Sequence, residues 1–163
     1  MGNIKKYVFS YNELENDSLL HTKDKLLLSK AKEVTAKAYA PYSDFFVGAA
    51  ALLSNKKIVT ATNQENASFP AGICAERVLL STITSLYGEA AIDTLAISYI
   101  NHKNNKSDHP ISPCGICRQS LMEYQLRVKH PIRLILAGMK GKVIIIDDAS
   151  FLLPLNFSGD DMA

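Results

Sequence analysis

The chain has 163 residues, of which 47% are hydrophobic and 21% are charged, and its formal net charge is +2. These values are ordinary for a globular protein with one core, and the small charge argues against a nucleic-acid partner. No stretch reaches the roughly 18 consecutive apolar residues of a membrane span, and the start lacks an apolar segment of secretory type. We therefore expect a cytoplasmic protein that binds neither nucleic acid nor a membrane.

Apolar residues recur with the period of a helix or of a strand along most of the chain. Pro41 and Gly88 end two helical patterns, and Pro113 begins a third, because a proline at the first helical position loses no hydrogen bond. The polar segment 102–109 is predicted to be an exposed loop. The predicted elements are a helix over 22–40, strands over 45–53 and 57–62, a helix over 73–87, a strand over 92–100, a helix over 113–125, and strands over 132–137 and 142–146.

This order of elements predicts an α/β protein with three layers, α/β/α, built on a five-stranded mixed sheet. The sequence contains no internal repeat and no low-complexity linker. We expect residues 21–163 to form a single domain and residues 1–20 to be an N-terminal extension.

The three cysteines are an odd number, which suits a metal or a reactive thiol better than a disulfide framework. Cys114 and Cys117 form a Pro-Cys-x-x-Cys sequence at a predicted helix start, where residues three apart share a face and the helix dipole stabilises thiolates. Cys74 begins a second motif, Cys-Ala-Glu-Arg, forty residues earlier. A structural zinc ion usually has four protein ligands, whereas a catalytic one keeps a position for water. Three cysteines therefore predict a catalytic Zn²⁺ site, with one ion per chain.

The two residues after Cys74-Ala75 carry charges that suit such a site. Glu76 is expected near the metal but not bound to it, where a carboxylate can move protons between water and a leaving nitrogen. Arg77 lies three residues after Cys74 on the same helix, so its guanidinium can donate to a coordinated sulfur. We expect Arg77 to withdraw negative charge from the three thiolates and so to restore the acidity of the bound water.

Other interpretations of these residues remain open from the pattern alone. The Cys-x-x-Cys pair could be a redox pair or half of a structural zinc site, and single cysteines are common as small buried hydrophobes. A Glu-Arg pair on a helix usually lies in solvent. The combination of both motifs in one chain favours the catalytic zinc site.

With these motifs the chain resembles the small homotetrameric cytidine deaminases, from about residue 38 to residue 157. The resemblance implies a cytidine deaminase-like fold and hydrolytic deamination of cytidine, and of 2′-deoxycytidine, in pyrimidine salvage. In that reaction a zinc-bound hydroxide attacks C4 of cytosine and Glu76 is the proton shuttle, giving uridine and ammonia.

The resemblance also implies which residues bind the nucleoside and how subunits assemble. Phe45 would line the pocket, Asn63 and Glu65 would bind sugar hydroxyls, and Ala75 would contact the substrate. By pattern alone Phe45 would be a core residue and the Asn-Gln-Glu-Asn-Ala stretch a solvated loop, but both lie beside the zinc motif. Phe157, in a C-terminal Leu-Leu-Pro-x-x-Phe sequence, would reach the active site of a neighbouring subunit, which predicts a homotetramer with shared active sites.

Two rival functions remain. A deaminase of another cytosine-bearing small molecule, similar to blasticidin S deaminase, would share the zinc motif but differ in the sugar-binding stretch, so Asn63 and Glu65 favour cytidine. A non-catalytic, zinc-stabilised binding module would have no use for Glu76 or for an open coordination position. The four histidines lie outside the motifs and are interpreted as surface or turn residues.

Overall fold

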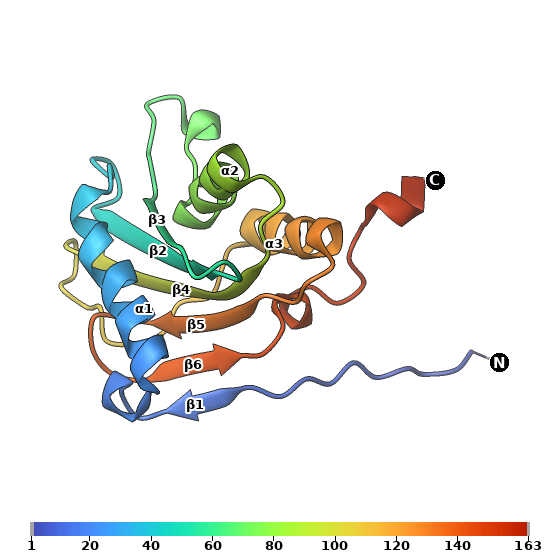
Figure 1. Cartoon of the computed structure of the whole chain (residues 1–163). Helices are drawn as coiled ribbons and strands as arrows, with labels where there is room; N and C mark the ends of the chain where they lie inside the picture. Colours follow the sequence, from blue (N-terminus) through green and yellow to red (C-terminus); the bar gives the residue numbers. More distant parts are fainter. Residues whose placement is uncertain (1, 163) are drawn as a thin grey trace.

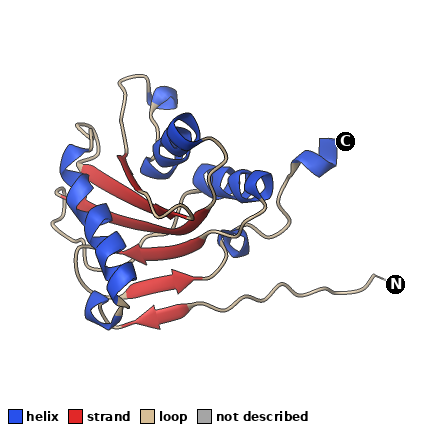
Figure 2. Ribbon diagram, in the orientation of Figure 1, coloured by secondary structure: helices blue, strands red, loops and turns tan. Residues whose placement is uncertain are grey.

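The computed structural model describes residues 2–162, in which one sheet lies between helices on both of its faces (Figures 1 and 2). Helix α1 (Thr22–Val34) covers one face, and α2 (Ala75–Tyr87) and α3 (Gly115–Val128) cover the other. The predicted three-layer α/β/α arrangement is confirmed. Among the described helices, none is long and apolar enough to cross a membrane.

The sheet is mixed, as predicted, but it has six strands instead of five. Its strand order is β1-β6-β5-β4-β2-β3, with β4 and β5 parallel and all other neighbours antiparallel. The strands are β1 (Asn12–Leu14), β2 (Phe45–Leu53), β3 (Ile58–Thr62), β4 (Ile92–Asn101), β5 (Arg133–Ala137) and β6 (Val143–Ile146).

The additional strand comes from the segment that was expected to be an N-terminal extension. Residues 12–14 pair with β6, where Leu14 lies opposite Val143. Three residues with the sequence Asn-Glu-Leu carry no alternating apolar pattern, so the strand has no signal in the sequence. It exists because the free edge of β6 offers backbone partners.

Helix α1 ends earlier than predicted. The helix stops at Val34, a 3-10 turn follows over residues 35–37, and Ala38 is extended. The N–H of Tyr39 donates to the carbonyl of Asn63, and the carbonyl of Tyr39 accepts from the N–H of Glu65. These bonds need extended backbone at residue 39, which excludes the helical conformation that Pro41 alone would have allowed.

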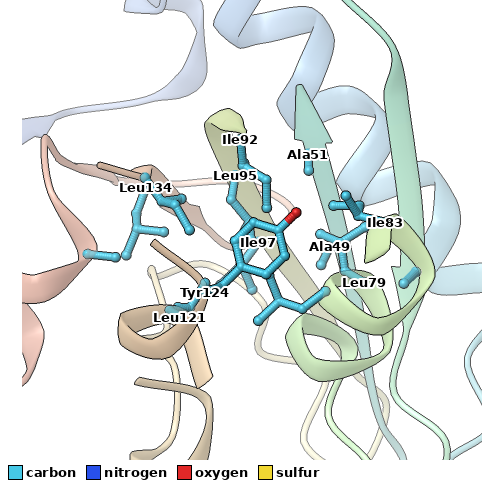
Figure 3. Close-up of a cluster of buried hydrophobic side chains, with 14 of the residues drawn as sticks. Ala49, Ala51, Leu79, Ile83, Ile92, Leu95, Ile97, Leu121, Tyr124 and Leu134 are labelled. Atoms are coloured by element: carbon cyan, nitrogen blue, oxygen red, sulfur yellow. The ribbon is translucent and has the colours of Figure 1, made fainter. Parts of the chain in front are cut away.

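Strand β2 supplies side chains to both layers of the core because successive residues point to opposite faces. Ala49, Ala51 and Leu53 pack with α2 and α3 in the larger cluster, part of which is drawn in Figure 3. Ala50 packs with α1 on the other face. At Gly48, a Cβ atom would collide with the carbonyl oxygen of Ala31, so glycine lets α1 lie close to the sheet.

Candidate functional site

Two helices begin at the site, and each begins directly after a cysteine. Cys74 is the N-cap of α2 and Cys114 is the N-cap of α3, both with extended backbone. Cys117 lies in the first turn of α3 and is fully buried. Each sulfur therefore lies near free N–H groups at the positive end of a helix dipole, which favours thiolates. The helix begins at Gly115, so Pro113 precedes the N-cap and is not its first residue.

The three sulfur atoms form one compact group. The Sγ atoms of Cys74 and Cys114 are 3.8 Å apart, those of Cys114 and Cys117 are 3.4 Å apart, and all three lie within 4.8 Å of one another. Tetrahedral zinc with bonds of about 2.3 Å would place its sulfurs about 3.8 Å apart. The residues therefore fit one zinc ion. Within residues 2–162, these cysteines are the one such group of three or more His, Cys, Asp or Glu side chains.

The thiol of Cys74 is more acidic than an ordinary cysteine thiol. A hydrogen bond from the Cys117 thiol, together with one from Cys114 and the positive charge of Arg77, outweighs burial and lowers the pKa of Cys74 to about 6. The same hydrogen bond to Cys74, along with burial and the charge of Glu76, raises the pKa of Cys117. The arrangement thus favours the thiolate form of Cys74, with Arg77 near enough to stabilise it.

Glu76 lies in the first turn of α2 and is buried, with only 5% of its surface exposed. Burial raises the pKa of its carboxyl group, and the charge of Cys74 raises it further. Hydrogen bonds from its own N–H and from the Cys117 thiol offset part of this rise. The structure therefore brings Glu76 against the cysteine group, as a carboxyl group that accepts a proton more readily than an exposed one.

The loop with Asn63 and Glu65 lies beside the cysteine group because of backbone hydrogen bonds. Gln64 and Ile73 exchange two of them, each 2.9 Å long, and Ile73 is the residue before Cys74. This isolated antiparallel bridge fixes the loop relative to the start of α2. Two stretches that are separate in the sequence are thereby joined in one site.

Asn63 holds the end of β2 with its side-chain amide. Its Oδ1 accepts a hydrogen bond from the N–H of Val47 at 2.7 Å, and its Nδ2 donates to the carbonyl of Phe45 at 2.9 Å. Asn63 follows β3, so the amide continues the pairing of β3 with β2 for two more residues. Asn63 and Phe45, which were both predicted to bind the substrate, are therefore in direct contact.

Glu65 faces a cavity of about 370 Å³ at the end of the loop. Its Oε2 accepts from the N–H groups of Tyr42 and Ser43, at 2.8 and 3.3 Å. Burial opposes ionisation, but the hydrogen bonds from Ser43 and Tyr42 lower the pKa of this carboxyl group. The cavity is lined by Tyr42, Ser43, Glu65, Asn66, Phe69 and Gly72.

The ring of Phe45 stacks on that of Tyr99, with centroids 4.8 Å apart and planes inclined by 20°. Tyr99 was missed in the sequence, and so were Tyr42 and Ser43. Tyr99 is the one aromatic residue of β4, and this is the signal that could have drawn attention to it. Tyr42 and Ser43 donate to Glu65 from their backbone N–H groups. Because every residue except proline has such a group, the residue type gives no signal of this contact.

The remaining predicted residues lie around α2 and α3. Ala75 is fully buried as the first residue of α2. Arg77 and Phe157 line a second cavity, of about 650 Å³, between α2, α3 and the C-terminal segment. The carbonyl of Phe157 accepts from Gln119 at 2.9 Å, and its side chain is 59% exposed. Phe45 and Glu65 do not line this cavity, so a single chain does not bring Phe157 to them.

Comparisons with known proteins agree with this geometry. The family model of the cytidine and deoxycytidylate deaminase zinc-binding region matches residues 21–130, which include all three cysteines and Glu76. The cytidine deaminase of Halalkalibacterium halodurans is 34% identical over 137 residues, or 84% of this chain and 96% of that protein. The cytidine deaminase of Mycobacterium tuberculosis H37Rv is 35% identical over 111 residues, or 66% of this chain and 78% of that protein.

Solved structures show the same fold. The crystal structure of cytidine deaminase from Burkholderia pseudomallei matches with a TM-score of 0.70 at 36% identity, covering 81% of this chain and 97% of that one. The crystal structure of cytidine deaminase from Mycobacterium tuberculosis matches with a TM-score of 0.64 at 29% identity, covering 84% of this chain and 98% of that one.

Proposed function

The chain belongs to the cytidine deaminase family, and we propose that it hydrolyses cytidine and 2′-deoxycytidine to uridine and 2′-deoxyuridine with release of ammonia. The observation that carries this proposal is the meeting of three sulfurs, spaced for one zinc ion, with a buried carboxyl group. The family resemblance and the site agree on a hydrolase that removes an amino group from a cytosine ring.

Cys74, Cys114 and Cys117 would hold the zinc ion. When bound, zinc supplies a Lewis acid that makes water acidic enough to act as the nucleophile near neutral pH. Glu76 takes one proton from the attacking water and gives it to N3 of the ring. It then takes the second proton of the same oxygen and gives it to the departing amino group, which leaves as ammonia. Its buried position suits this work because a carboxyl group with a raised pKa holds a proton long enough to pass it on.

Asn63 and Glu65 bind the sugar in this proposal. The hydrogen bonds from the N–H groups of Tyr42 and Ser43 both go to Oε2, so Oε1 can accept from a ribose hydroxyl. Asn63 also fixes the pocket wall, because its side-chain amide holds the backbone of Phe45 and Val47. Its second Nδ2 hydrogen and second Oδ1 lone pair remain for a sugar hydroxyl. Phe45 then presents its ring to the pyrimidine, and Ala75 contacts the substrate from the start of α2.

We also propose a homotetramer in which Phe157 completes the active site of a neighbouring subunit. Its position in a separate cavity supports this, because within one chain it is apart from Phe45 and Glu65. Exposed apolar side chains on α2 and α3, such as Leu86 and Ile116 at 65% and 63%, suit a subunit contact.

The purified protein tests the proposed function directly. Incubation with cytidine should form uridine and ammonia in equal amounts, and a metal assay should find one zinc ion per chain. A panel of cytidine, 2′-deoxycytidine and blasticidin S separates the rival small-molecule function, which predicts turnover of blasticidin S alone. Zinc content without turnover of any of the three would favour the non-catalytic binding module.

The cytoplasmic location and the lack of nucleic-acid binding stay predictions. Fractionation of cells tests the location. Addition of single-stranded DNA or RNA to the cytidine assay tests the predicted lack of nucleic-acid binding, since a polyanion that does not bind leaves the rate unchanged.

A further inference from the structure

Tyr99 lies behind Phe45, on the face of the sheet that α2 and α3 cover. Its exposed fraction is 1%. It lies opposite Val47 in the pairing of β4 with β2, and therefore diagonal to Phe45. The near-parallel stacking of the two rings, at 4.8 Å, makes Tyr99 the support of the Phe45 ring.

The hydroxyl of Tyr99 contacts a residue from the polar segment 102–109. It lies 3.2 Å from Nδ1 of His109, and the His109 ring stands edge-on to the Tyr99 ring at 5.8 Å. Asp108 Oδ1 lies 3.3 Å from the same ring nitrogen. A buried hydroxyl without a partner costs free energy, so His109 makes the buried position of Tyr99 tolerable and orients its ring.

The segment that supplies His109 is itself fixed to the β5–β6 turn. The carbonyl of Ser107 accepts from the N–H groups of Met139 and Lys140, at 2.7 and 3.3 Å. At Gly141, a Cβ atom would collide with the carbonyl oxygen of Asp108. These contacts tie the segment to the β5–β6 turn and hold His109 beside Tyr99.

We propose that Tyr99 and His109 are positioning residues that hold Phe45 as the wall of the pyrimidine pocket and thereby set the affinity for the nucleoside. This inference rests on the proposed function, in which Phe45 faces the base. A pocket wall touches the base equally before and during the reaction, so loosening it weakens binding without slowing chemistry. The role therefore predicts a change in KM with kcat nearly constant.

The variants Tyr99→Phe and His109→Ala test the pair. Each removes the hydrogen bond while keeping the Phe45 stacking partner, and each should raise KM for cytidine about three- to tenfold with kcat within about twofold. The double variant should be no worse than His109→Ala, because that variant already removes both the imidazole hydrogen bond and the edge-on ring. Titration of zinc-loaded protein with uridine by calorimetry should show the same weakening, which does not depend on turnover.

His102→Ala is the matched control. His102 belongs to the same loop and stands edge-on to Phe46 at 5.2 Å, and Phe46 points to the opposite face of the sheet. The KM of His102→Ala for cytidine should equal that of the wild type. Unchanged KM and uridine affinity in both Tyr99→Phe and His109→Ala, even with lower thermal stability, would refute the positioning role. Wild-type protein that turns over no cytidine would instead refute the proposed function.

Discussion

The backbone N–H of Ile73 donates to the carbonyl of Gln64, and the N–H of Gln64 donates back to Ile73, each over 2.9 Å. Ile73 precedes Cys74, while Gln64 stands between Asn63 and Glu65. This single backbone bridge therefore connects the cysteine group to the proposed sugar-binding loop. Since neither partner is a side chain of the site, the connection depends on backbone geometry alone.

Replacement of Glu65 by Gln should lower kcat/KM for cytidine by about 10- to 100-fold, because an amide accepts more weakly from a ribose hydroxyl than a carboxylate does. Hydrogen bonds from Tyr42 and Ser43 can persist to the amide oxygen, so the loop should keep its position. Steady-state kinetics measure the effect, with Glu89→Gln as an exposed control. Equal losses in both variants would contradict the sugar-binding role.

Replacement of Glu76 by Gln should abolish most turnover while zinc stays bound. The amide has nearly the same shape but cannot carry a proton, so we expect kcat to fall about 10²- to 10⁴-fold. Zinc per chain, measured on the same sample by atomic emission, should stay near that of the wild type. A variant with normal kcat would remove Glu76 from the mechanism, and one that loses its zinc would make Glu76 a ligand.

The centre of the site could be predicted from the sequence because its signals are local. The predicted helices over 73–87 and 113–125 each have a cysteine as their second residue. The observed helices begin two residues later, with Cys74 and Cys114 as N-caps, so the thiols still lie at helix starts. The spacing of Cys114 and Cys117 likewise predicts that their sulfurs share a face. The assignment of Phe45, Asn63 and Glu65 needed the resemblance to a family, because their residue types alone fit a core position and a loop.

The parts that could not be predicted depend on contacts between distant segments. The hydrogen bond between Tyr99 and His109 closes a loop without any periodic pattern. The end of α1 was misplaced because Tyr39 pairs with the loop at residues 63–65, and this pairing is visible only in three dimensions. Strand β1 likewise depends on the free edge of β6 and not on its own three residues.

Replacement of Arg77 by Gln should weaken zinc retention. The guanidinium charge helps to lower the pKa of Cys74, so without it the thiolate is less stable and competes less well for the metal. We expect about a 10- to 100-fold loss of zinc affinity in a chelator competition, with partial recovery in Arg77→Lys. Arg127→Gln, which removes another arginine from the same cavity, is the control and should keep wild-type affinity.

Mixing two inactive variants tests whether Phe157 acts between subunits. Phe157→Ala removes the aromatic ring and Glu76→Gln removes the proton carrier, so each variant alone should be nearly inactive in the proposed homotetramer. After joint refolding, sites that combine an intact Glu76 with a neighbour's intact Phe157 should appear, at up to about one quarter of all sites. Recovery of cytidine turnover supports the shared site. Full activity of Phe157→Ala on its own, or of a monomer, would contradict it.

Asp148 should make the stability of the fold depend on pH in the acidic range. Its Oδ1 accepts from Gln125 Nε2 and from the Ser150 N–H, both at 2.8 Å, which ties α3 to the C-terminal segment. Burial alone would raise the pKa of this carboxyl group, but the hydrogen bonds from Gln125 and Ser150 lower it below the ordinary 3.8. A group with a lowered pKa in the folded state stabilises the protein above its unfolded pKa, and this contribution is lost as the pH falls through the folded value.

Asp148→Asn should therefore lower the free energy of unfolding by about 1 kcal/mol near neutral pH, because hydrogen bonds to a charged carboxylate are stronger than those to a neutral amide oxygen. The difference from the wild type should shrink as the pH falls below about 4, because the wild-type carboxyl group is then protonated as well. Urea unfolding of both proteins at several pH values measures it. Asp147→Asn is the neighbouring control, since Asp147 is 75% exposed and reaches Arg133 only at 3.9 Å. A difference that stays constant down to low pH would mean that the side chain acts through its shape and not through its charge.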